Sequence, residues 1–499
     1  MTSVERILPP LEQQVKYEFV RYTVGIGVDL GYGKERPFEH TVGLRLRGTP
    51  GDVVPNVGVD NLYQLDSIVD GSCDFVVAAD VFPKCEDAPE AVRDWLRVVK
   101  VGGHICIYEP TGNKQAMLAI AEAVCYNIDV VALSTWGAGA FVVLKKTDDN
   151  QVMHFSYAKA RPKKSVMVVR HGGIGDQLQA AYLLPELKRQ GYHITFLTTK
   201  ESIEVINSDP HVDEWFVIGK EQIPNNQLVP FWSVISKHYD KFVNLNESCE
   251  GSLLTIPGRP SHLWPHAVRH KLMNRNYAEF SATLGEIPFV PEGEFHATES
   301  EIEWSDAFKD KAREVTGIGD PFFIMWVLAG SSPHKFTPHQ DTVIKMIMGS
   351  LPEAVVVLVG NEAGKILEAG WELEKRVIRT SGNMPIRETL ALAKMMDAVV
   401  GPETGVLNSV CYLDVPKVIM LSHSSDENLT KHWVNVHVIP GQATCHPCHR
   451  LHYTSEYCPQ DPDTHAAVCQ QGVDPRIIYA PIEHEYNAWV RTSLIARVA

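Results

Sequence analysis

The sequence predicts an α/β protein made of three successive Rossmann-like units, of which the last two form a pair of lobes. Three blocks of the chain alternate apolar, strand-like segments with amphipathic, helix-like segments. This alternation is typical of mostly parallel sheets covered by helices. A chain of 499 residues is also long enough for about three domains. We expect these domains to span residues 1–150, 163–300 and 301–499.

The composition is ordinary for a globular protein, with 44% apolar and 21% charged residues. No apolar run reaches about eighteen residues, and the N-terminal residues lack the continuous apolar core of a signal peptide. We therefore expect no transmembrane segment and a cytoplasmic location. The formal net charge of −15 disfavours binding to nucleic acid, because an acidic surface repels phosphate.

The first block covers residues 22–146. Its strand candidates are 24–30, 40–46, 73–80, 104–110 and 140–146. The helix candidate at 91–100 places four apolar residues on one face at helical spacing, namely Val92, Trp95, Leu96 and Val99. Asp29 lies near the end of the first strand, and Gly31 and Gly33 follow, where glycine lets the backbone turn sharply and approach a ligand.

This block resembles a class I S-adenosylmethionine-dependent methyltransferase. In that family a strand that begins with Asp-Phe, as at Asp74, precedes a helix, a Leu-Lys-Pro-Gly-Gly type turn and another strand; here the turn is residues 99–103. The resemblance implies a methyltransferase fold with S-adenosylmethionine bound near Asp29, Gly31 and Gly33.

Arg45 separates two interpretations of this domain. The family carries near this place an acid whose carboxylate binds the ribose hydroxyls of the cofactor, and a cation cannot accept those hydrogen bonds. We therefore favour a degenerate domain that keeps the fold as a docking module over an active methyltransferase.

The second block opens with a strand, a glycine loop, a helix, a turn and a strand, which together make one βαβ unit at residues 165–199. Gly172, Gly173 and Gly175 form the loop, and Asp176 stands at the start of the helix. Further strand candidates follow at 215–219 and 241–246.

The third block repeats this pattern after a Pro- and Glu-rich stretch at 286–301, which is the predicted passage between the lobes. Its strand candidates are 322–330, 354–360 and 398–405, the last ending in a loop, and its helix candidates include 342–348 and 407–412. Lys335 lies in the loop after the first of these strands.

Residues 165–480 resemble the family-nine glycosyltransferases, which include the ADP-heptose–lipopolysaccharide heptosyltransferases. The resemblance rests on the strand and Gly-Asp loop at 168–176, the Leu-Leu-Pro stretch in the following helix, and the loops at 331–338 and 401–405. It implies the two-lobed GT-B fold, with N-terminal acceptor and C-terminal donor lobes, and an inverting single displacement that needs no divalent metal.

Sugar transfer requires a base for the acceptor hydroxyl and positive charge on the departing diphosphate. In the family, the Asp that matches Asp176 is the proposed general base, whereas composition alone would make Asp176 a helix cap. The resemblance assigns the donor diphosphate to Lys335, for which a compact ammonium is well suited. We predict that Asp176 and Lys335 are the catalytic residues and face one another across one cleft.

Further donor-binding residues are predicted at Ser331, Ser332, Glu362, Glu403, Thr404, Gly405 and Asn408. The serines would add hydroxyl donors, Glu362 would contact the ribose, and backbone N–H groups at Thr404 and Gly405 would cradle the diphosphate at a helix N-terminus. Glu403 replaces the family's usual Asp, and Asn408 stands where many members carry His. The corresponding loop of the acceptor lobe consists of Gly172, Gly173 and Gly175.

Four of the ten cysteines cluster near the C-terminus, at Cys445, Cys448, Cys458 and Cys469. The first two form a C-x-x-C pair, as in structural zinc sites, but the last two are single. A structural zinc ion, two disulfide bonds and four free thiols all remain open. A reducing compartment favours the metal-bound or bridge-free states.

The predicted function is transfer of a heptose-like sugar from a nucleotide diphosphate sugar, such as ADP-heptose, to a hydroxyl acceptor such as a surface glycan of lipopolysaccharide biosynthesis. The transfer itself needs no cofactor, and the protein would act in the cytoplasm, at the periphery of the inner membrane, or in a phage-infected bacterial cell. Two alternatives stay open: a bifunctional enzyme that also methylates, and a non-catalytic protein that binds nucleotide sugars.

Overall fold

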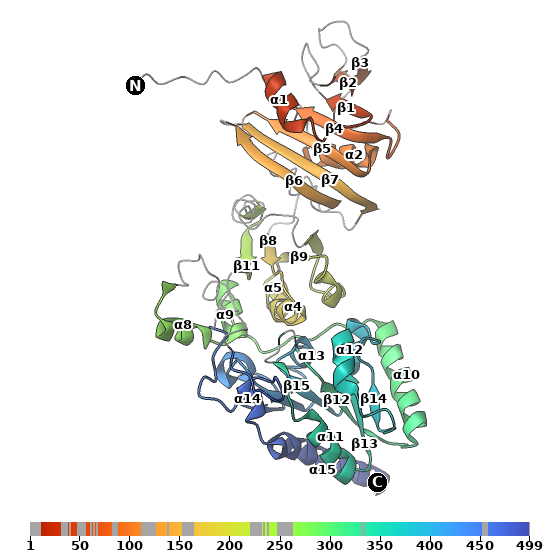
Figure 1. Cartoon of the computed structure of the whole chain (residues 1–499), viewed down its shortest axis with the longest axis vertical. Coiled ribbons are helices and arrows are strands. Elements are labelled where there is room, and N and C mark those ends of the chain that lie inside the picture. Colours follow the sequence, from red (N-terminus) through yellow and green to blue (C-terminus); the bar gives the residue numbers. More distant parts are fainter. Residues whose placement is uncertain are drawn as a thin grey trace. The chain divides into compact units, whose positions relative to one another are not determined.

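The computed structural model (Figure 1) describes residues 11–30, 38, 41–46, 56–59, 62, 65, 68–81, 88–110, 126–136, 139–151, 164–219, 232, 235–236, 239–246, 263–330, 332, 335–451 and 458–498. Contacts divide the chain into two compact units. Unit 1 comprises Met1–Met167, Thr195–Glu201 and Glu214–Phe242, and unit 2 comprises Val168–Ile194, Ser202–Asp213 and Val243–Ala499. The predicted domain boundaries at 150, 163 and 300 differ from this division and stay a prediction.

Unit 1 contains a seven-stranded sheet in the order β3-β2-β1-β4-β5-β7-β6. The strands are β1 (Gly27–Leu30), β2 (Thr41–Leu46), β3 (Asn56–Val59), β4 (Cys73–Ala79), β5 (Val99–Glu109), β6 (Tyr126–Trp136) and β7 (Gly139–Gln151). The first five pair in parallel, and β7 runs antiparallel to β5 and β6. The order 3-2-1-4-5 is that of a doubly wound sheet. The predicted α/β, methyltransferase-like fold is therefore confirmed.

Two details of the first block were predicted wrongly. Residues 99–103 are not a turn but the first part of β5, because Val99 pairs with Cys73 ahead of a bulge in β5 and Lys100 forms an ion pair with Asp74 at 2.9 Å. Strands β3 and β6 had not been predicted. Of the antiparallel edge formed by β6 and β7, the sequence pattern indicated only the strand at 140–146.

Two helices of unit 1 are described, α1 (Leu11–Phe19) and α2 (Ala88–Val98). The apolar face predicted for the second of these is confirmed, since Val92, Trp95 and Leu96 are all buried. The indole Nε1 of Trp95 donates to the carbonyl of Leu62 at 2.9 Å. From α1, Val15 packs with strand residues in one core cluster.

A second sheet has four strands in the order β10-β9-β8-β11. They are β8 (Ser165–Val169), β9 (His193–Thr199), β10 (Glu214–Ile218) and β11 (Lys241–Asn244), and each matches a predicted strand. The predicted βαβ unit carries helices α4 (Ile174–Ala181) and α5 (Leu184–Arg189) between its two strands. Further elements are η2 (Ile203–Val205), α8 (His266–Met273) and α9 (Tyr277–Leu284).

The third sheet, in unit 2, has six parallel strands in the order β14-β13-β12-β15-β16-β17. The strands are β12 (Phe322–Val327), β13 (Ala354–Val359), β14 (Val377–Arg379), β15 (Ala398–Pro402), β16 (Lys417–Met420) and β17 (Val436–Ile439). In order of appearance this is 3-2-1-4-5-6, and ligands of such sheets bind beyond the carboxyl ends of the strands where the order reverses. That point lies between β12 and β15.

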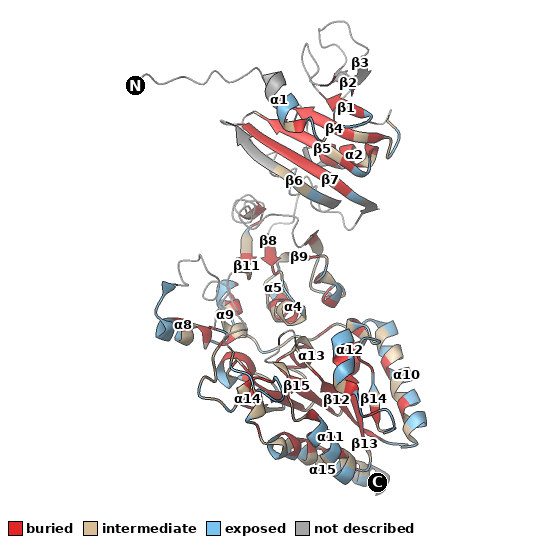
Figure 2. Cartoon of the chain, viewed as in Figure 1, coloured by how far each residue is buried: buried red, intermediate tan, exposed pale blue. Residues whose placement is uncertain are grey.

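Helices pack on both faces of this sheet, as the alternation of side chains along β12 requires. Phe322, Ile324 and Trp326 share a core cluster with α11 (Gln340–Ser350) and α15 (Pro475–Val498). Phe323 points the other way, toward α10 (Glu299–Thr316), where Lys309 Nζ lies 5.1 Å from its ring centroid. Figure 2 shows the resulting buried strands between helices that each turn an exposed face outward.

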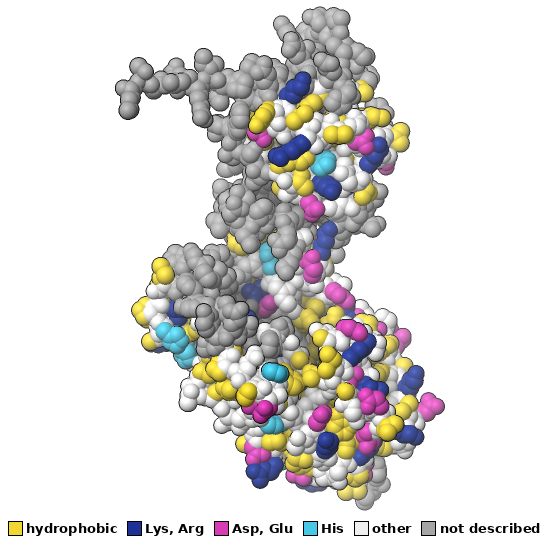
Figure 3. Space-filling view, viewed as in Figure 1, with side chains coloured by type: hydrophobic (Ala, Val, Ile, Leu, Met, Phe, Trp, Pro, Cys, Tyr) yellow, Lys and Arg dark blue, Asp and Glu magenta, His cyan; other side chains and the backbone are white. Residues whose placement is uncertain are grey.

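The remaining elements of unit 2 are η7 (Glu362–Glu368), α12 (Ile386–Ala393), α13 (Gly405–Ser409), η8 (Asp426–Thr430) and α14 (Val468–Gln471). On the face of unit 2 drawn in Figure 3, acidic and basic side chains are interspersed and do not form a patch of one charge. In the described residues, no helix has both the length and the apolar character that crossing a membrane would require.

Candidate functional site

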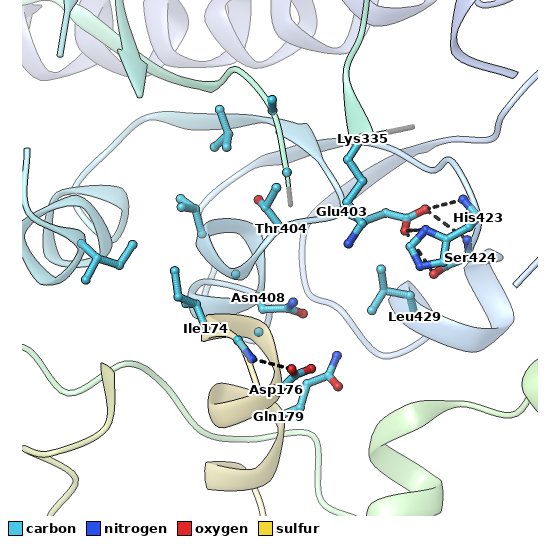
Figure 4. Close-up of a pocket in the computed structure, with 18 of the residues that line it drawn as sticks. Ile174, Asp176, Gln179, Lys335, Glu403, Thr404, Asn408, His423, Ser424 and Leu429 are labelled. Atoms are coloured by element: carbon cyan, nitrogen blue, oxygen red, sulfur yellow. Dashed lines mark hydrogen bonds and ion pairs between the residues drawn. The ribbon is translucent and has the colours of Figure 1, made fainter. Parts of the chain in front are cut away.

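A pocket of about 640 Å³ lies in unit 2, where the loops after β12 and β15 meet the N-terminus of α4 (Figure 4). It therefore occupies the place at which the strand order predicts a ligand. Of the predicted site residues, eight line it: Gly173, Gly175, Asp176, Lys335, Glu403, Thr404, Gly405 and Asn408. The two residues predicted as catalytic thus face a single pocket.

Asp176 both lines the pocket and caps a helix. Its Oδ2 accepts a hydrogen bond of 2.6 Å from the amide of Gly173, and its Oδ1 lies 3.0 Å from the guanidinium of Arg170. Arg170 is buried and also donates to the carbonyl of Leu245 at 2.7 Å. The helix-cap interpretation and the pocket interpretation therefore hold together, because the same carboxylate is fixed by the cap and by Arg170 while it faces the pocket.

Glycines allow the close contacts that bring α4 to the pocket. Gly172 has φ = 124°, and a Cβ on it would lie 2.1 Å from Asp176 Oδ2. A Cβ on Gly405 would lie 2.4 Å from Ile174 Cγ2, and one on Gly175 would lie 3.0 Å from Asn408 Nδ2. The N-termini of α4 and α13 can approach this closely only because Gly175 and Gly405 have no side chains.

Lys335 comes from the loop after β12. A short antiparallel bridge between Ala329 and Phe336 closes this loop, and the Lys335 amide donates to the carbonyl of Ser332 at 2.9 Å. In the described part of the chain, no carboxylate lies within ion-pair distance of its ammonium. Its charge nevertheless acts on Glu403, whose pKa it helps to lower.

Glu403 is buried and points into the protein rather than serving as an open pocket acid. Its Oε1 accepts hydrogen bonds from the amides of Ser422, His423 and Ser424 at 2.5, 3.1 and 3.1 Å. Its Oε2 lies 2.5 Å from His423 Nδ1 and accepts the hydroxyl of Ser424 at 3.2 Å. Glu403 therefore holds the turn at 422–424 in shape at the pocket wall.

The charge states of this pair follow from its surroundings. Burial opposes ionisation of Glu403, but His423, Lys335 and the backbone N–H donors outweigh it and lower its pKa. Burial lowers the pKa of His423, against the opposing effect of Glu403. Glu403 and His423 therefore form one buried, hydrogen-bonded pair at the pocket wall.

Thr404 and Asn408 sit at the two ends of α13. The hydroxyl oxygen of Thr404 is buried and has no hydrogen-bond partner among the described residues, although Thr404 is the N-cap of this helix. Asn408 is buried, and its carbonyl accepts a hydrogen bond from the hydroxyl of Tyr182. Thr404 therefore brings a hydroxyl without a described protein partner to the pocket lining, whereas the backbone carbonyl of Asn408 is already engaged.

Three other residues that were predicted to belong to the site do not line the pocket. Glu362 has a side chain that is 76% exposed and pairs with Lys365 at 2.8 Å. Gly172 and Ser332 also lie outside the lining, and Ser331 lies outside the described residues. The neighbouring Asn361, rather than Glu362, faces the pocket at the start of η7.

The sequence reasoning missed several lining residues that come from segments far apart in the chain: Gln179, Met273, Tyr277, His423, Ser424, Leu429, His449 and Arg450. Burial, with help from His270 and His423, lowers the pKa of His449 to about 3, so this imidazole is neutral at physiological pH. A signal for His423 existed, since it follows the end of a parallel strand, as Lys335 and Thr404 do. No comparable signal marked Met273 or Tyr277.

The segment of the clustered cysteines contacts the turn at 422–424 through Cys469 and two histidines. Ser422 O accepts from His446 Nδ1 at 3.1 Å and contacts Cys469 Sγ at 3.7 Å, and His423 O accepts the amide of His449 at 2.8 Å. All four thiols are free, and burial raises the pKa of Cys448 to about 11 and of Cys469 to about 12. They do not form a described group with metal-ligand spacing. The predicted structural zinc therefore stays a prediction.

The predicted S-adenosylmethionine site is described in part. Asp29 is buried near the carboxyl end of β1, beside the point between β1 and β4 where the strand order reverses. Gly31, Gly33 and the side chain of Arg45 lie outside the described residues.

A family model described as a methyltransferase domain matches residues 46–107, inside the first predicted block. The predicted methyltransferase-like domain is confirmed by this match. No curated protein matches the sequence.

Among solved structures, the chain is similar to glycosyl transferase family 9 from Veillonella parvula, with 13% identity and a TM-score of 0.48, covering 66% of this chain and 99% of that one. It is also similar to ADP-heptose lipopolysaccharide heptosyltransferase II of E. coli, with 15% identity and a TM-score of 0.46, covering 65% and 99%. A third is the iron-containing dodecameric glycosyltransferase TibC of enterotoxigenic E. coli, with 10% identity and a TM-score of 0.44, covering 71% and 84%.

Proposed function

We propose that unit 2 carries a glycosyltransferase site that moves a sugar from a nucleotide diphosphate sugar to a hydroxyl acceptor. The observation that supports this most directly is the shared pocket of Asp176 and Lys335. A carboxylate and an ammonium there supply the base and the positive charge that sugar transfer requires. The pocket volume of about 640 Å³ is within the range of sites for small-molecule ligands and cofactors.

In the proposed reaction the acceptor oxygen forms a bond to the anomeric carbon while the bond from that carbon to the diphosphate breaks. Asp176 takes the proton of the acceptor hydroxyl, and Arg170 and the Gly173 amide keep its carboxylate in place. The diphosphate leaves with the electron pair, and Lys335 offsets its charge. One displacement inverts the anomeric centre, and Lys335 takes the part that a divalent metal plays in other transferases.

Thr404 and the backbone N–H groups at the start of α13 are the proposed contacts for the diphosphate, as donors of hydrogen bonds to its oxygens. Glu403 does not bind the donor in this proposal. Its role is positional, because it holds the 422–424 turn that carries His423 and Ser424 into the pocket wall. The donor is proposed to be ADP-heptose-like and the acceptor a surface glycan, on the strength of the motif resemblance.

The test measures donor binding and turnover separately. Nucleotide diphosphate sugars are screened by thermal shift, since a ligand of the folded state raises the melting temperature. With the sugar that binds, Asp176→Asn is expected to keep donor affinity within about twofold but to lose turnover by at least about 100-fold. Lys335→Met is expected to weaken donor binding and turnover together, and Lys335→Arg to restore part of both.

Each variant has a matched control. Glu301→Gln removes an acid that, like Asp176, is the third residue of a capped helix and pairs with a buried arginine, here Arg387. Lys345→Met removes an exposed lysine of α11 that does not line the pocket. If Glu301→Gln costs as much turnover as Asp176→Asn, the effect is one of helix stability and the base assignment fails.

A second function, methyl transfer by unit 1, is favoured by the doubly wound strand order and by the methyltransferase-domain match at 46–107. Under the bifunctional proposal, S-adenosylmethionine binds the full chain, and Gly31→Val or Gly33→Val abolishes that binding without affecting nucleotide-sugar binding. Under the docking-module proposal, which Arg45 favours, calorimetry detects no binding of S-adenosylmethionine. The measurement decides between the two.

A further inference from the structure

Three side chains with metal-ligating atoms converge in unit 2, apart from the pocket and from the cysteines. They are Asp209, His211 and His296, and one ligand atom from each lies within 4.8 Å of the other two. His211 Nδ1 lies 2.8 Å from Asp209 Oδ1, and His296 Nε2 lies 4.0 Å from Asp209 Oδ2. Within the described ranges, no other set of three His, Cys, Asp or Glu residues meets this spacing.

The surroundings of Asp209 are unusual for a carboxylate that has no ligand. Its side chain is 5% exposed, and a buried charge is costly unless it is paired. It accepts hydrogen bonds from the backbone amide of His211 at 2.9 Å and from the imidazole, but no described lysine or arginine lies within ion-pair distance of it. The imidazoles of His211 and His296 are 27% and 26% exposed, so an ion can reach them from solvent.

We infer that Asp209, His211 and His296 bind one divalent transition-metal ion of the zinc class, with water completing the coordination. Two imidazoles and a carboxylate are ligands that such ions accept. In a tetrahedral site, neighbouring ligand atoms lie about 3.3 Å apart. The 4.0 Å distance between His296 Nε2 and Asp209 Oδ2 therefore shortens by less than about 1 Å, through side-chain rotation, when the ion binds. The proton shared by His211 Nδ1 and Asp209 leaves to solvent as the ion replaces it.

The ion would join two segments that are far apart in the sequence. Asp209 and His211 follow η2, whereas His296 precedes α10 in the predicted passage between lobes. Arg387 already contacts both segments, donating to Ser208 Oγ at 2.7 Å and to His296 O at 3.0 Å. The metal therefore adds a stabilising cross-link rather than a catalytic centre, and its role does not depend on sugar transfer.

Cobalt(II) tests this site in the full chain after removal of bound metal by a chelator. We expect one equivalent of Co²⁺ whose near-ultraviolet spectrum lacks sulfur-to-cobalt charge transfer, which separates it from any ion on the cysteines. His296→Gln and His211→Gln are each expected to weaken binding of that equivalent by at least about tenfold. The rise in melting temperature on adding Co²⁺ shrinks in both variants, because less ion binds the folded state.

His193→Gln is the matched control. His193 is half-buried in the same unit and lies 3.7 Å from a carboxylate of Asp213, yet it belongs to no three-residue group. It is expected to keep the cobalt equivalent in full. The inference is overturned if the metal-free wild-type chain binds no such equivalent of Co²⁺. It is also overturned if both His211→Gln and His296→Gln still bind that equivalent with unchanged affinity. Should His296→Gln fail to fold, His211→Gln carries the same test.

Discussion

Replacing Glu403 by Gln is expected to loosen the pocket wall without emptying the core. The side chain keeps its volume, but the three amide donors of residues 422–424 then bond a neutral oxygen instead of a carboxylate. Hydrogen bonds to charged groups contribute about 1 kcal/mol more than neutral ones, so three of them make about 3 kcal/mol. Local opening of this turn should therefore become about 150-fold more frequent.

Hydrogen exchange of the amides of Ser422, His423 and Ser424 measures that opening directly. The effect also carries a pH signature, because the pKa of Glu403 in the folded protein lies below its unfolded value of about 4.3. The stabilisation is present in full above pH of about 5 and is lost as pH falls further, whereas the Gln variant lacks this loss.

Glu368→Gln provides the control for the exchange experiment. Glu368 is a buried carboxylate that accepts the amides of Thr380 and Ser381 at 3.2 and 2.9 Å, away from the pocket lining. Its substitution should speed exchange at those two amides and leave 422–424 unchanged. The reasoning is refuted if Glu403→Gln changes exchange at 422–424 by less than about threefold, or if Glu368→Gln loosens that turn equally.

Three further outcomes are expected. Gly405→Ala should destabilise unit 2 by about 1–3 kcal/mol in denaturant unfolding, because the added Cβ would overlap Ile174. Adding Ile174→Ala to this variant should recover part of the loss. An unaltered denaturation midpoint in Gly405→Ala would contradict the close contact. Lys417 is buried, and burial lowers its pKa to about 8. Because the unfolded chain keeps this proton to about pH 10.4, the free energy of unfolding should rise between pH 8 and 10 by up to about 3 kcal/mol. Lys417→Met should abolish this rise. Gly27→Ala would place a Cβ 2.2 Å from the Phe75 ring, so circular dichroism should report earlier melting of the unit 1 sheet, and equal melting would show that the ring moves freely.

The sequence predicted the parallel strands well because their signal is local. Runs such as 322–327 and 354–359 are continuously apolar, which is what burial on both faces of a parallel sheet requires. Strand β6 carries no such run, since Asp129 and Val131 are exposed on an edge of the sheet. Its pairing with β7 depends on contacts that no local pattern expresses.

The residues of the candidate site, too, could be predicted from the sequence only in part. Loops that follow strands could be located, and with them Lys335 and Thr404. The direction in which a side chain points could not, as Glu403 and Glu362 show: one turns inward to a backbone turn 19 residues away, and the other turns to solvent beside Lys365. Tyr277 and His449 reach the pocket through packing of distant segments, which a single sequence does not encode locally.

One peptide group connects the thiol of Cys469 to the ligand pocket. Its carbonyl, from Ser422, faces His446 and Cys469, and its N–H, from His423, donates to Glu403. Because a peptide group is planar, neither end can rotate without the other. Alkylation or oxidation of Cys469 would be transmitted to the carboxylate by the tilt of a single amide plane.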